Sequence, residues 1–223
     1  MIKQGPIYYI NPNSTEAMTE HIVCSAKKVL GDDITVIGET CHGAPPAIQG
    51  PADAVAAKPI LFKKLEDAAN SGAKMAVIAC FDDPFLNEAR ENFPMPIIGI
   101  GGSAFYMCSM FPENFGIITT VADAVPVIEK NLESHGLANR CDIVLASEIP
   151  VLEFEKNPID AQFRMENLLR TLLEEKKLGS LALGCAGMSY LAGPLTKKFG
   201  LQCIDGVVAS ALLSKSMFNL PKE

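Results

Sequence analysis

Short apolar runs alternate with helical patterns along the whole chain, and this alternation occurs twice. The first set of strand-like runs lies at 7–10, 34–37, 75–79 and 96–100, and the second at 115–119, 142–145, 181–184 and 202–205. Helical patterns lie between them, at 15–30, 58–72, 121–136, 158–177, 187–199 and 206–217. Such alternation is typical of parallel sheets with helices on both faces. We therefore predict an α/β protein.

The two sets also match each other in spacing. Ile10 precedes Cys80 by 70 residues, and Ile118 precedes Cys185 by 67 residues. Each isoleucine ends a strand that runs into polar, helix-capping residues. We predict two pseudo-symmetric lobes, each a mainly parallel sheet flanked by helices, with the active site in the cleft between them.

The boundary between the lobes is expected near residues 97–102, where Gly101 and Gly102 are expected to form a tight turn. The last helical pattern is expected to return to the first lobe. Lobe 1 then comprises residues 1–98 plus 206–223, and lobe 2 comprises residues 99–205. The longest irregular connection, 38–51, follows a strand and is expected to form one wall of the pocket.

Composition and charge exclude several classes of partner. The chain of 223 residues carries a net charge of −7 without a basic block, so we expect no nucleic acid and no anionic membrane as partner. Its apolar runs are far shorter than the roughly 20 residues of a membrane span. The amino terminus lacks the features of a secretory signal. We expect a cytoplasmic enzyme, a homo-oligomer, that acts on a small molecule.

The seven cysteines do not have the spacing of a metal site. No Cys-x-x-Cys pair occurs, so we expect no structural zinc, and most of these thiols are expected to be small buried hydrophobes. Cys80 and Cys185 differ from the others because each closes an apolar run and directly precedes a polar, helix-opening segment. Ligands of open α/β folds bind at this carboxyl edge of the sheet.

The positions of Cys80 and Cys185 suggest acid–base chemistry. A helix amino terminus next to each sulfur is expected to lower the pKa of the thiol toward neutrality. A thiolate on one face of a carbon acid removes its proton, and a thiol on the other face returns one. This inverts a stereocentre without a cofactor, provided that one thiol at a time is charged. The alternative is two buried structural cysteines.

Polar residues at the strand ends are candidates for substrate binding. Asn11 and Ser14 follow the first strand, and Thr119 and Thr120 end the equivalent strand of the second set, where their donors would stabilise a carbonyl oxygen that gains negative charge. Asp82 and Asp83 are candidates for a general base, although capping of the next helix is the favoured interpretation. His42, in the long connection, is a further candidate for the pocket lining.

No motif for a bound nucleotide is present. Gly99-Ile-Gly-Gly102 lacks the spacing of a dinucleotide fingerprint, and no phosphate-binding Gly-x-x-x-x-Gly-Lys element occurs. We therefore expect no cofactor.

Five parts of the chain carry a family resemblance: Ile10-Asn-Pro-Asn-Ser-Thr with Met18-Thr19, Ala79-Cys-Phe-Asp-Asp-Pro84, Gly99-Ile-Gly101, Gly184-Cys-Ala-Gly-Met188 and Ile204-Asp-Gly-Val207. They resemble the hydantoin racemase family, which includes allantoin racemases and belongs to the aspartate/glutamate racemase superfamily. The resemblance implies cofactor-independent inversion at C5 of a 5-substituted hydantoin, with Cys80 and Cys185 as the acid–base pair. It also implies that the amides after each cysteine (Phe81 and Asp82; Ala186 and Gly187) hold the ring, with Asn11, Ser14, Thr119 and Thr120 nearby.

The chain departs from this family at two positions. Gly102 stands where the family often has Glu, and Phe85 where it usually has Gly. Ile48, Phe81, Phe85 and Phe105 are candidates for an apolar pocket around the 5-substituent.

Phe81 and Ala186 disfavour free aspartate or glutamate as the substrate, because amino-acid racemases of the superfamily have polar residues there. Two alternatives to a hydantoin racemase stay open. A maleate-isomerase-like enzyme would use one cysteine as a nucleophile. A non-catalytic domain that binds a small molecule would tolerate loss of both thiols.

Overall fold

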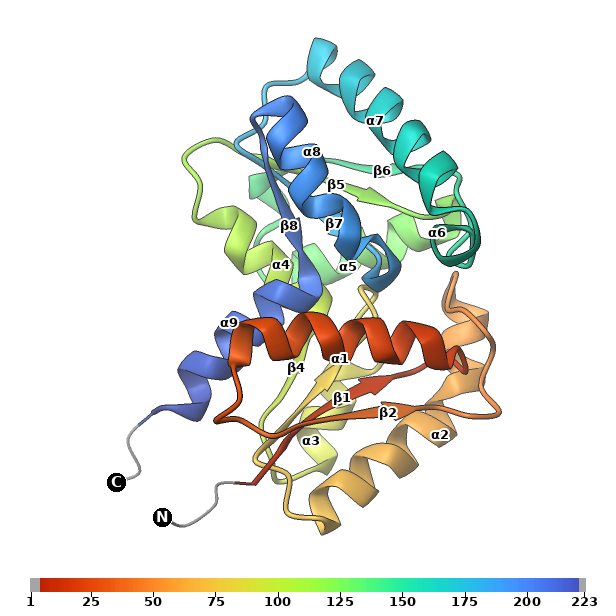
Figure 1. The fold of residues 1–223 in the computed structure, drawn as a ribbon, viewed down its shortest axis with the longest axis vertical. Helices are drawn as coiled ribbons and strands as arrows, with labels where there is room; N and C mark the ends of the chain where they lie inside the picture. Colours follow the sequence, from red (N-terminus) through yellow and green to blue (C-terminus); the bar gives the residue numbers. More distant parts are fainter. Residues whose placement is uncertain (1–4, 221–223) are drawn as a thin grey trace.

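The computed structural model describes residues 5–220 and contains two four-stranded sheets, both entirely parallel (Figure 1). The first has the order β2-β1-β3-β4 and the second the order β6-β5-β7-β8, so the two sheets have the same topology. The strands are β1 (Ile7–Asn11), β2 (Val36–Thr40), β3 (Met75–Ile78), β4 (Ile97–Gly99), β5 (Phe115–Thr119), β6 (Cys141–Ala146), β7 (Ser180–Gly184) and β8 (Gln202–Asp205). The predicted fold class, two lobes of parallel sheet flanked by helices, is confirmed.

Helices cover both faces of each sheet. The α-helices are α1 (Glu16–Leu30), α2 (Pro51–Asn70), α3 (Leu86–Asn92), α4 (Ile100–Ser109), α5 (Val125–Ser134), α6 (Glu153–Lys156), α7 (Pro158–Glu175), α8 (Ala192–Phe199) and α9 (Gly206–Phe218). Three 3₁₀ helices are η1 (Ala122–Ala124), η2 (Ala138–Arg140) and η3 (Ala186–Leu191).

Alternation along each strand divides the core into layers. In β1, Ile7 and Tyr9 face α1 and α9, whereas Tyr8 and Ile10 face α2 and α3. Side chains of β5 divide in the same way, with Ile118 toward α7 and α8 and Ile117 toward α4 and α5. Because both faces are covered, the strands are apolar throughout rather than alternating apolar and polar.

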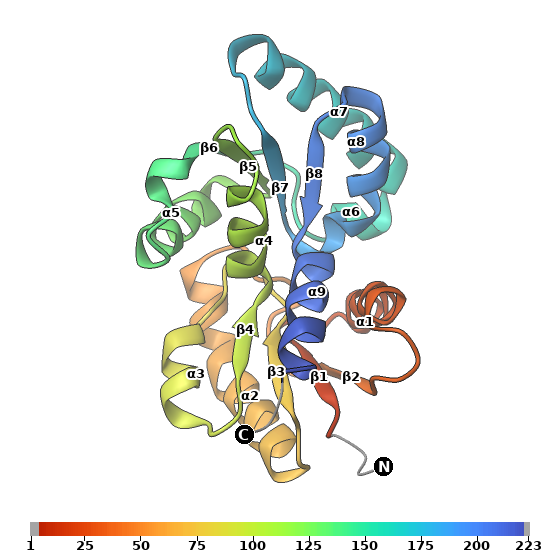
Figure 2. The same ribbon diagram turned by 90° about the vertical axis from the view of Figure 1, so that its left-hand side faces the viewer.

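Two helices change lobes. Helix α4 follows β4 of the first sheet but packs on the second, where Phe105 and Cys108 join the core around Phe115. Helix α9 follows β8 of the second sheet but packs beside α1 on the first. The two helices lie side by side at the junction of the lobes (Figure 2). This exchange supports the proposed division into 1–98 plus 206–223 and 99–205, which stays a prediction.

The structure differs from the expected elements in three places. Helix α2 begins at Pro51, seven residues before the predicted start at 58, with a proline at the position where its missing N–H costs nothing. Helices α4 and α6 were not predicted, and α3, which was expected to open directly after Cys80, begins only at Leu86. Gly101 and Gly102 form no turn between the lobes, because they lie in the first turn of α4. Among residues 5–220, none of the helices has both the length and the apolar character to cross a membrane.

Candidate active site

A small cavity lies between the lobes, where the central strands of both sheets end. Its lining combines residues of the first lobe, such as Cys80, with residues of the second, such as Cys185. Of the candidates from the sequence, Ile48, Cys80, Phe81, Asp82, Thr120, Cys185 and Ala186 line it. The cavity volume is about 20 Å³, room for about one water molecule. The site is therefore nearly closed.

The two cysteines occupy equivalent positions in the two lobes. Cys80 lies two residues beyond β3, and Cys185 directly follows β7. In each case the backbone N–H two residues further on, that of Asp82 or Gly187, donates a hydrogen bond to the sulfur. The internal symmetry of the fold thus brings two thiols, one from each lobe and each with its own amide donor, to one cavity.

The expected lowering of the thiol pKa values is wrong. Burial raises the pKa of Cys185 to about 12, and burial together with the negative charge of Asp82 raises the pKa of Cys80 well above its ordinary value. The amide donors oppose this effect without reversing it. Only Cys185 precedes a helical turn directly, because η3 begins at Ala186, whereas α3 begins at Leu86, six residues after Cys80. Both thiols are therefore protonated in the closed site.

The segment after Cys80 is a tight loop and not a helix start. Asp83 and Phe85 have φ of 45° and 57°, in the left-handed region that favours glycine. Asp83 accepts hydrogen bonds from the amides of Gly101 (3.0 Å) and Gly102 (2.6 Å). It therefore caps α4, which is not the next helix along the chain but the one after it.

Phe85 stands where the resemblance predicts glycine, and its left-handed backbone explains that preference. Its ring packs edge-on against Phe62, with the ammonium of Lys58 4.8 Å from the ring centroid. These contacts hold the ring against α2. Neither Phe85 nor the fully buried Phe105 lines the cavity, so the expected apolar pocket keeps only Ile48 and Phe81.

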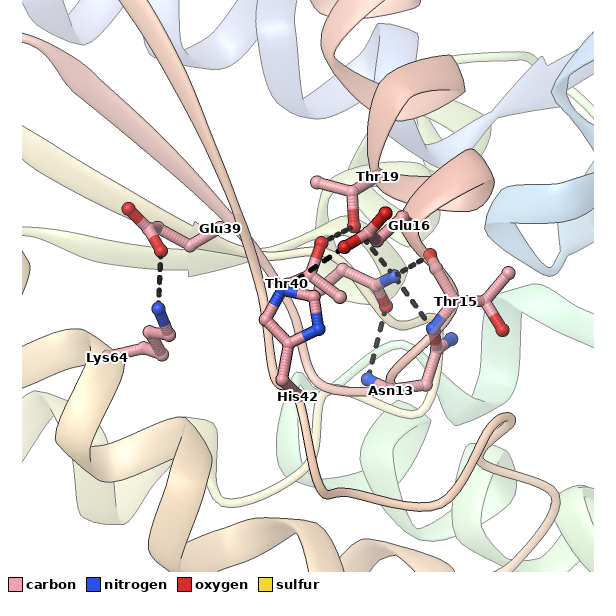
Figure 3. Close-up of polar contacts among 9 residues, drawn as sticks. Asn13, Thr15, Glu16, Thr19, Glu39, Thr40, His42 and Lys64 are labelled. Atoms are coloured by element: carbon pink, nitrogen blue, oxygen red, sulfur yellow. Dashed lines mark hydrogen bonds and ion pairs between the residues drawn. The ribbon is translucent and has the colours of Figure 1, made fainter.

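The loop between β1 and α1 is held by side-chain hydrogen bonds (Figure 3). The Asn11 amide donates to Asn13 Oδ1 (2.8 Å) and to Thr19 Oγ1 (3.1 Å). The Asn13 amide nitrogen in turn lies 3.3 Å from the sulfur of Met18, and both Asn13 and Met18 line the cavity. Asn11 is thus buried behind Asn13 and shapes the loop without lining the cavity.

Three further candidates lie next to the cavity. The Ser14 amide donates to Pro45 O (3.0 Å) and so ties the loop to the 41–50 connection. The buried Thr119 hydroxyl donates to Gly184 O (3.3 Å) at the end of β7. Gly187 borders a neighbouring groove, while its amide reaches Cys185.

The 41–50 connection contacts the second lobe. Gln49 Oε1 accepts a hydrogen bond from the amide of Val151 (2.9 Å), and Ile48 and Val151 both line the cavity. His42 is exposed and pairs with Glu16 (3.5 Å), outside the cavity lining. The connection therefore forms a wall of the site through Ile48 and not through His42.

Five lining residues were not predicted. Two have direct neighbours among the candidates: Ala79 precedes Cys80, and Gly184 precedes Cys185. Asn13 lies in the predicted substrate-binding segment after the first strand, but the residues predicted to bind substrate there were Asn11 and Ser14. Met18 lies on α1 and Val151 lies between β6 and α6, and only the tertiary fold brings them to the cavity. Within residues 5–220, no group of three or more His, Cys, Asp or Glu side chains is arranged to hold a metal ion.

The fold and the paired cysteines define a class of protein, a two-lobed α/β enzyme with one thiol from each lobe at a shared cavity. Residues 7–213 match the family model for Asp/Glu/Hydantoin racemase, and the chain belongs to that family. The predicted isomerase of the racemase type is thereby confirmed.

Individual relatives agree with this assignment. The chain is 34% identical over 95% of its length to a hydantoin racemase from Rhizobium meliloti, of which it covers 88%. The structure is similar to an allantoin racemase from Klebsiella pneumoniae, with a TM-score of 0.91, 31% identity, and coverage of 96% of this chain and 87% of that one. A glutamate racemase from Bacillus anthracis, at 16% identity and a TM-score of 0.76 over 97% of this chain and 82% of that one, shares the fold.

Proposed function

We propose that this racemase inverts the C5 stereocentre of a 5-substituted hydantoin or an allantoin-like ring, without a cofactor. The observation that supports the proposal is that Cys80 and Cys185, each from the same place in its own lobe, line one cavity. A planar carbon acid between them exposes one face to each thiol. The names of the relatives, hydantoin racemase and allantoin racemase, support a cyclic ureide as the substrate.

The two thiols act in turn as base and acid. A thiolate removes the C5 proton, and the opposite thiol donates its proton to the other face of the carbanion. The negative charge that develops on the neighbouring carbonyl oxygen requires donors, and Thr120 and the amides after the two cysteines are the candidates in the cavity wall. We assign ring binding to Phe81, Asp82, Ala186 and Gly187 and contact with the 5-substituent to Ile48, while Asn11, Ser14 and Thr119 shape the surrounding loops.

Replacement of either thiol tests the two-base mechanism. We expect Cys80→Ser and Cys185→Ser each to lower racemisation by ~10²–10⁴-fold, because each removes one proton-transfer group. In heavy water each variant should incorporate deuterium from one enantiomer only. The measurements are polarimetry and mass spectrometry on single-enantiomer 5-substituted hydantoins and allantoin.

The control is Cys24→Ser, since this exposed cysteine lies outside the cavity. Racemisation at the wild-type rate by both single variants would exclude the two-base mechanism. A covalent mass adduct on one cysteine would instead indicate a nucleophilic isomerase, and ligand-induced stabilisation without turnover would indicate a binding domain. Size-exclusion chromatography of the same samples tests the expected homo-oligomer.

A further inference from the structure

Asp82 is a buried carboxyl group without a hydrogen-bond partner. The residue is 7% exposed and lines the cavity together with Cys80 and Cys185. Within residues 5–220 its carboxylate oxygens take part in no hydrogen bond or ion pair, whereas the adjacent Asp83 accepts two amide hydrogen bonds. Its oxygens are not among the fully buried, unpaired side-chain atoms of the described residues, so they face the open space of the cavity, where they are available for proton transfer.

The backbone of Asp82 is fixed from both sides of the cleft. Its N–H donates to the sulfur of Cys80 in the same loop, and its carbonyl oxygen accepts from Asn131 Nδ2 (2.7 Å) on α5 of the other lobe. The next residue, Asp83, anchors the loop to α4. The loop that carries the carboxyl group is therefore held to both lobes.

The three acidic groups share one small cavity. Its volume is about 20 Å³, room for about one water molecule, and Asp82, Cys80 and Cys185 all line it. The charge of Asp82 raises the pKa of both thiols. Two negative charges in this space therefore repel each other, and the three groups titrate as a coupled set.

Other titratable groups lie further out. Asp83 is the neighbour of Asp82 in the loop, and Arg90 contributes a positive charge near Asp83. On the side of the second lobe, Glu155 and Asp205 add negative charge near Cys185. None of them changes the pKa of Asp82 noticeably, because burial alone raises it to about 7. Asp82 is thus the group of the cavity that changes charge near neutral pH.

We propose, resting on the proposed function, that Asp82 is the proton acceptor that generates the catalytic thiolate, so that Asp82, Cys80 and Cys185 share two protons and one negative charge. The Asp82 carboxylate takes the proton of one thiol, which leaves a thiolate and a neutral carboxylic acid. That thiolate removes the proton of the carbon acid and becomes a thiol again. The opposite thiol protonates the other face and becomes a thiolate, which then recovers the proton held by Asp82.

This cycle balances. Each thiol ends protonated, Asp82 ends as a carboxylate, and the substrate has exchanged one proton for another on its opposite face. The total charge of the three groups and the reacting carbon acid stays at −1 in every step, because the carbanion carries the negative charge while all three groups are protonated. The arrangement also meets the requirement that only one thiol at a time is charged. While one cysteine is a thiolate, Asp82 holds the proton that this cysteine has lost.

The test follows thiol reactivity without any substrate. Iodoacetamide alkylates thiolates, so its rate at Cys80 and Cys185, measured by peptide mass spectrometry from pH 5 to pH 10, reports the thiolate population of each. In the wild-type protein we expect this rate to rise up to about pH 7, as Asp82 ionises, and then to reach a plateau. In Asp82→Asn the plateau should vanish, and the rate should rise about tenfold per pH unit. Cys24 in the same digest is the internal control.

Activity gives the second measurement. Asp82→Asn should lower kcat at least tenfold at pH 7.5 (about 1.4 kcal/mol in barrier) and remove the inflection near pH 7 from the pH profile of kcat. Asp83→Asn, the matched control, should keep that inflection. A wild-type alkylation profile without a plateau, or faster racemisation by Asp82→Asn, would overturn the proposal, because either result means that the Asp82 charge only opposes thiolate formation.

The two proposals fail in different ways. If Cys80 and Cys185 show the plateau but no cyclic ureide is racemised, the shared proton stands and the substrate is wrong. If a hydantoin is racemised and only KM changes in Asp82→Asn with an unaltered pH profile, the substrate stands and Asp82 merely binds it.

Discussion

At the scale of single residues, Asp82 and Asp83 show how neighbouring carboxyl groups acquire different tasks. Both are buried, and burial raises the pKa of each to about 7. The oxygens of Asp83 accept hydrogen bonds from two backbone amides of α4, whereas the oxygens of Asp82 face the cavity without a hydrogen-bond donor. The two residues are identical and adjacent in the sequence. We attribute the difference in their hydrogen bonding to the left-handed backbone at Asp83, which directs the two side chains to different surroundings.

This difference predicts unequal effects of amide substitution on stability. The folded-state pKa of Asp82 lies above the ordinary value of 3.8, so the folded protein binds more protons between about pH 4 and pH 7, and stability falls as pH rises through that range. Asp82→Asn should therefore raise the free energy of unfolding by ~1–3 kcal/mol at pH 8, with little effect at pH 4. Denaturant titrations at both pH values measure this.

Asp83→Asn is the matched comparison and should give a less favourable result. Burial raises the pKa of Asp83 to about 7 as well, so its charge also lowers stability at pH 8. The asparagine amide group would face a backbone N–H where the carboxylate accepts one, so we expect the free energy of unfolding of Asp83→Asn to be ~1–3 kcal/mol lower than that of Asp82→Asn at pH 8. Equal effects of the two substitutions would show that the carboxyl groups are equivalent. Together with the loss of activity expected for Asp82→Asn, a gain in stability would mark Asp82 as a residue kept for function at the expense of stability.

At the scale of elements, helix α4 depends on glycines that allow close approach. A Cβ atom at Gly99 or Gly101 would lie 2.0 Å from Asp83 Oδ1 or 2.1 Å from Phe81 O, respectively. At Gly102 a Cβ would lie 2.9 Å from Cε1 and Nε2 of His135. The imidazole of His135 thus occupies the space into which a longer side chain at position 102 would extend, which explains why glycine and not Glu stands there.

The contact between Gly102 and His135 yields a double-mutant prediction. The ring of His135 packs against Phe105 and Tyr106, so it cannot move aside freely, and Gly102→Ala should destabilise the protein by ~1–3 kcal/mol. In a His135→Ala background the same change should stabilise it by ~0.5–1 kcal/mol, because alanine favours the helix over glycine. Chemical denaturation of the four proteins gives the coupling energy. Additive effects would mean that His135 is not the obstacle.

Helix α4 also shows where prediction from the sequence ends. The eight strands were predictable because each is an apolar run between polar segments. The run Ile100-Gly-Gly-Ser-Ala104 contains two glycines and no local cap, and its helical conformation depends on a carboxylate from another loop. Likewise, the strand ends indicated Cys80 and Cys185, but Val151 reaches the cavity from a segment without any local signal of it, and Met18 was noted only as part of the family resemblance.

At the scale of the whole molecule, the two lobes close over a cavity too small for a five-membered ring. Entry of a substrate of the proposed kind therefore requires the lobes to separate. The 41–50 connection spans the cleft through the hydrogen bond between Gln49 and Val151, and Gly50 lies against Asp123 of η1 in the other lobe. These contacts must break each time the site opens. The lobes stay joined by α4 and α9, each of which follows a strand of one lobe and packs on the other lobe.

A disulfide across the cleft tests this requirement. A Cβ built on Gly50 lies 3.3 Å from Asp123 Cβ, close to the roughly 3.5–4.5 Å of natural disulfides. The backbone of Gly50 is extended (φ 166°), which any residue adopts. We expect the oxidised Gly50→Cys/Asp123→Cys variant to lose racemisation by at least about tenfold and to protect Cys185 from iodoacetamide, because the lobes stay closed. Dithiothreitol should restore racemisation and the reaction of Cys185 with iodoacetamide.

Each single variant under oxidising conditions is the control. Full activity of the cross-linked protein would mean that substrate reaches the thiols without separation of the lobes, through the side of the cleft where α1 faces η3.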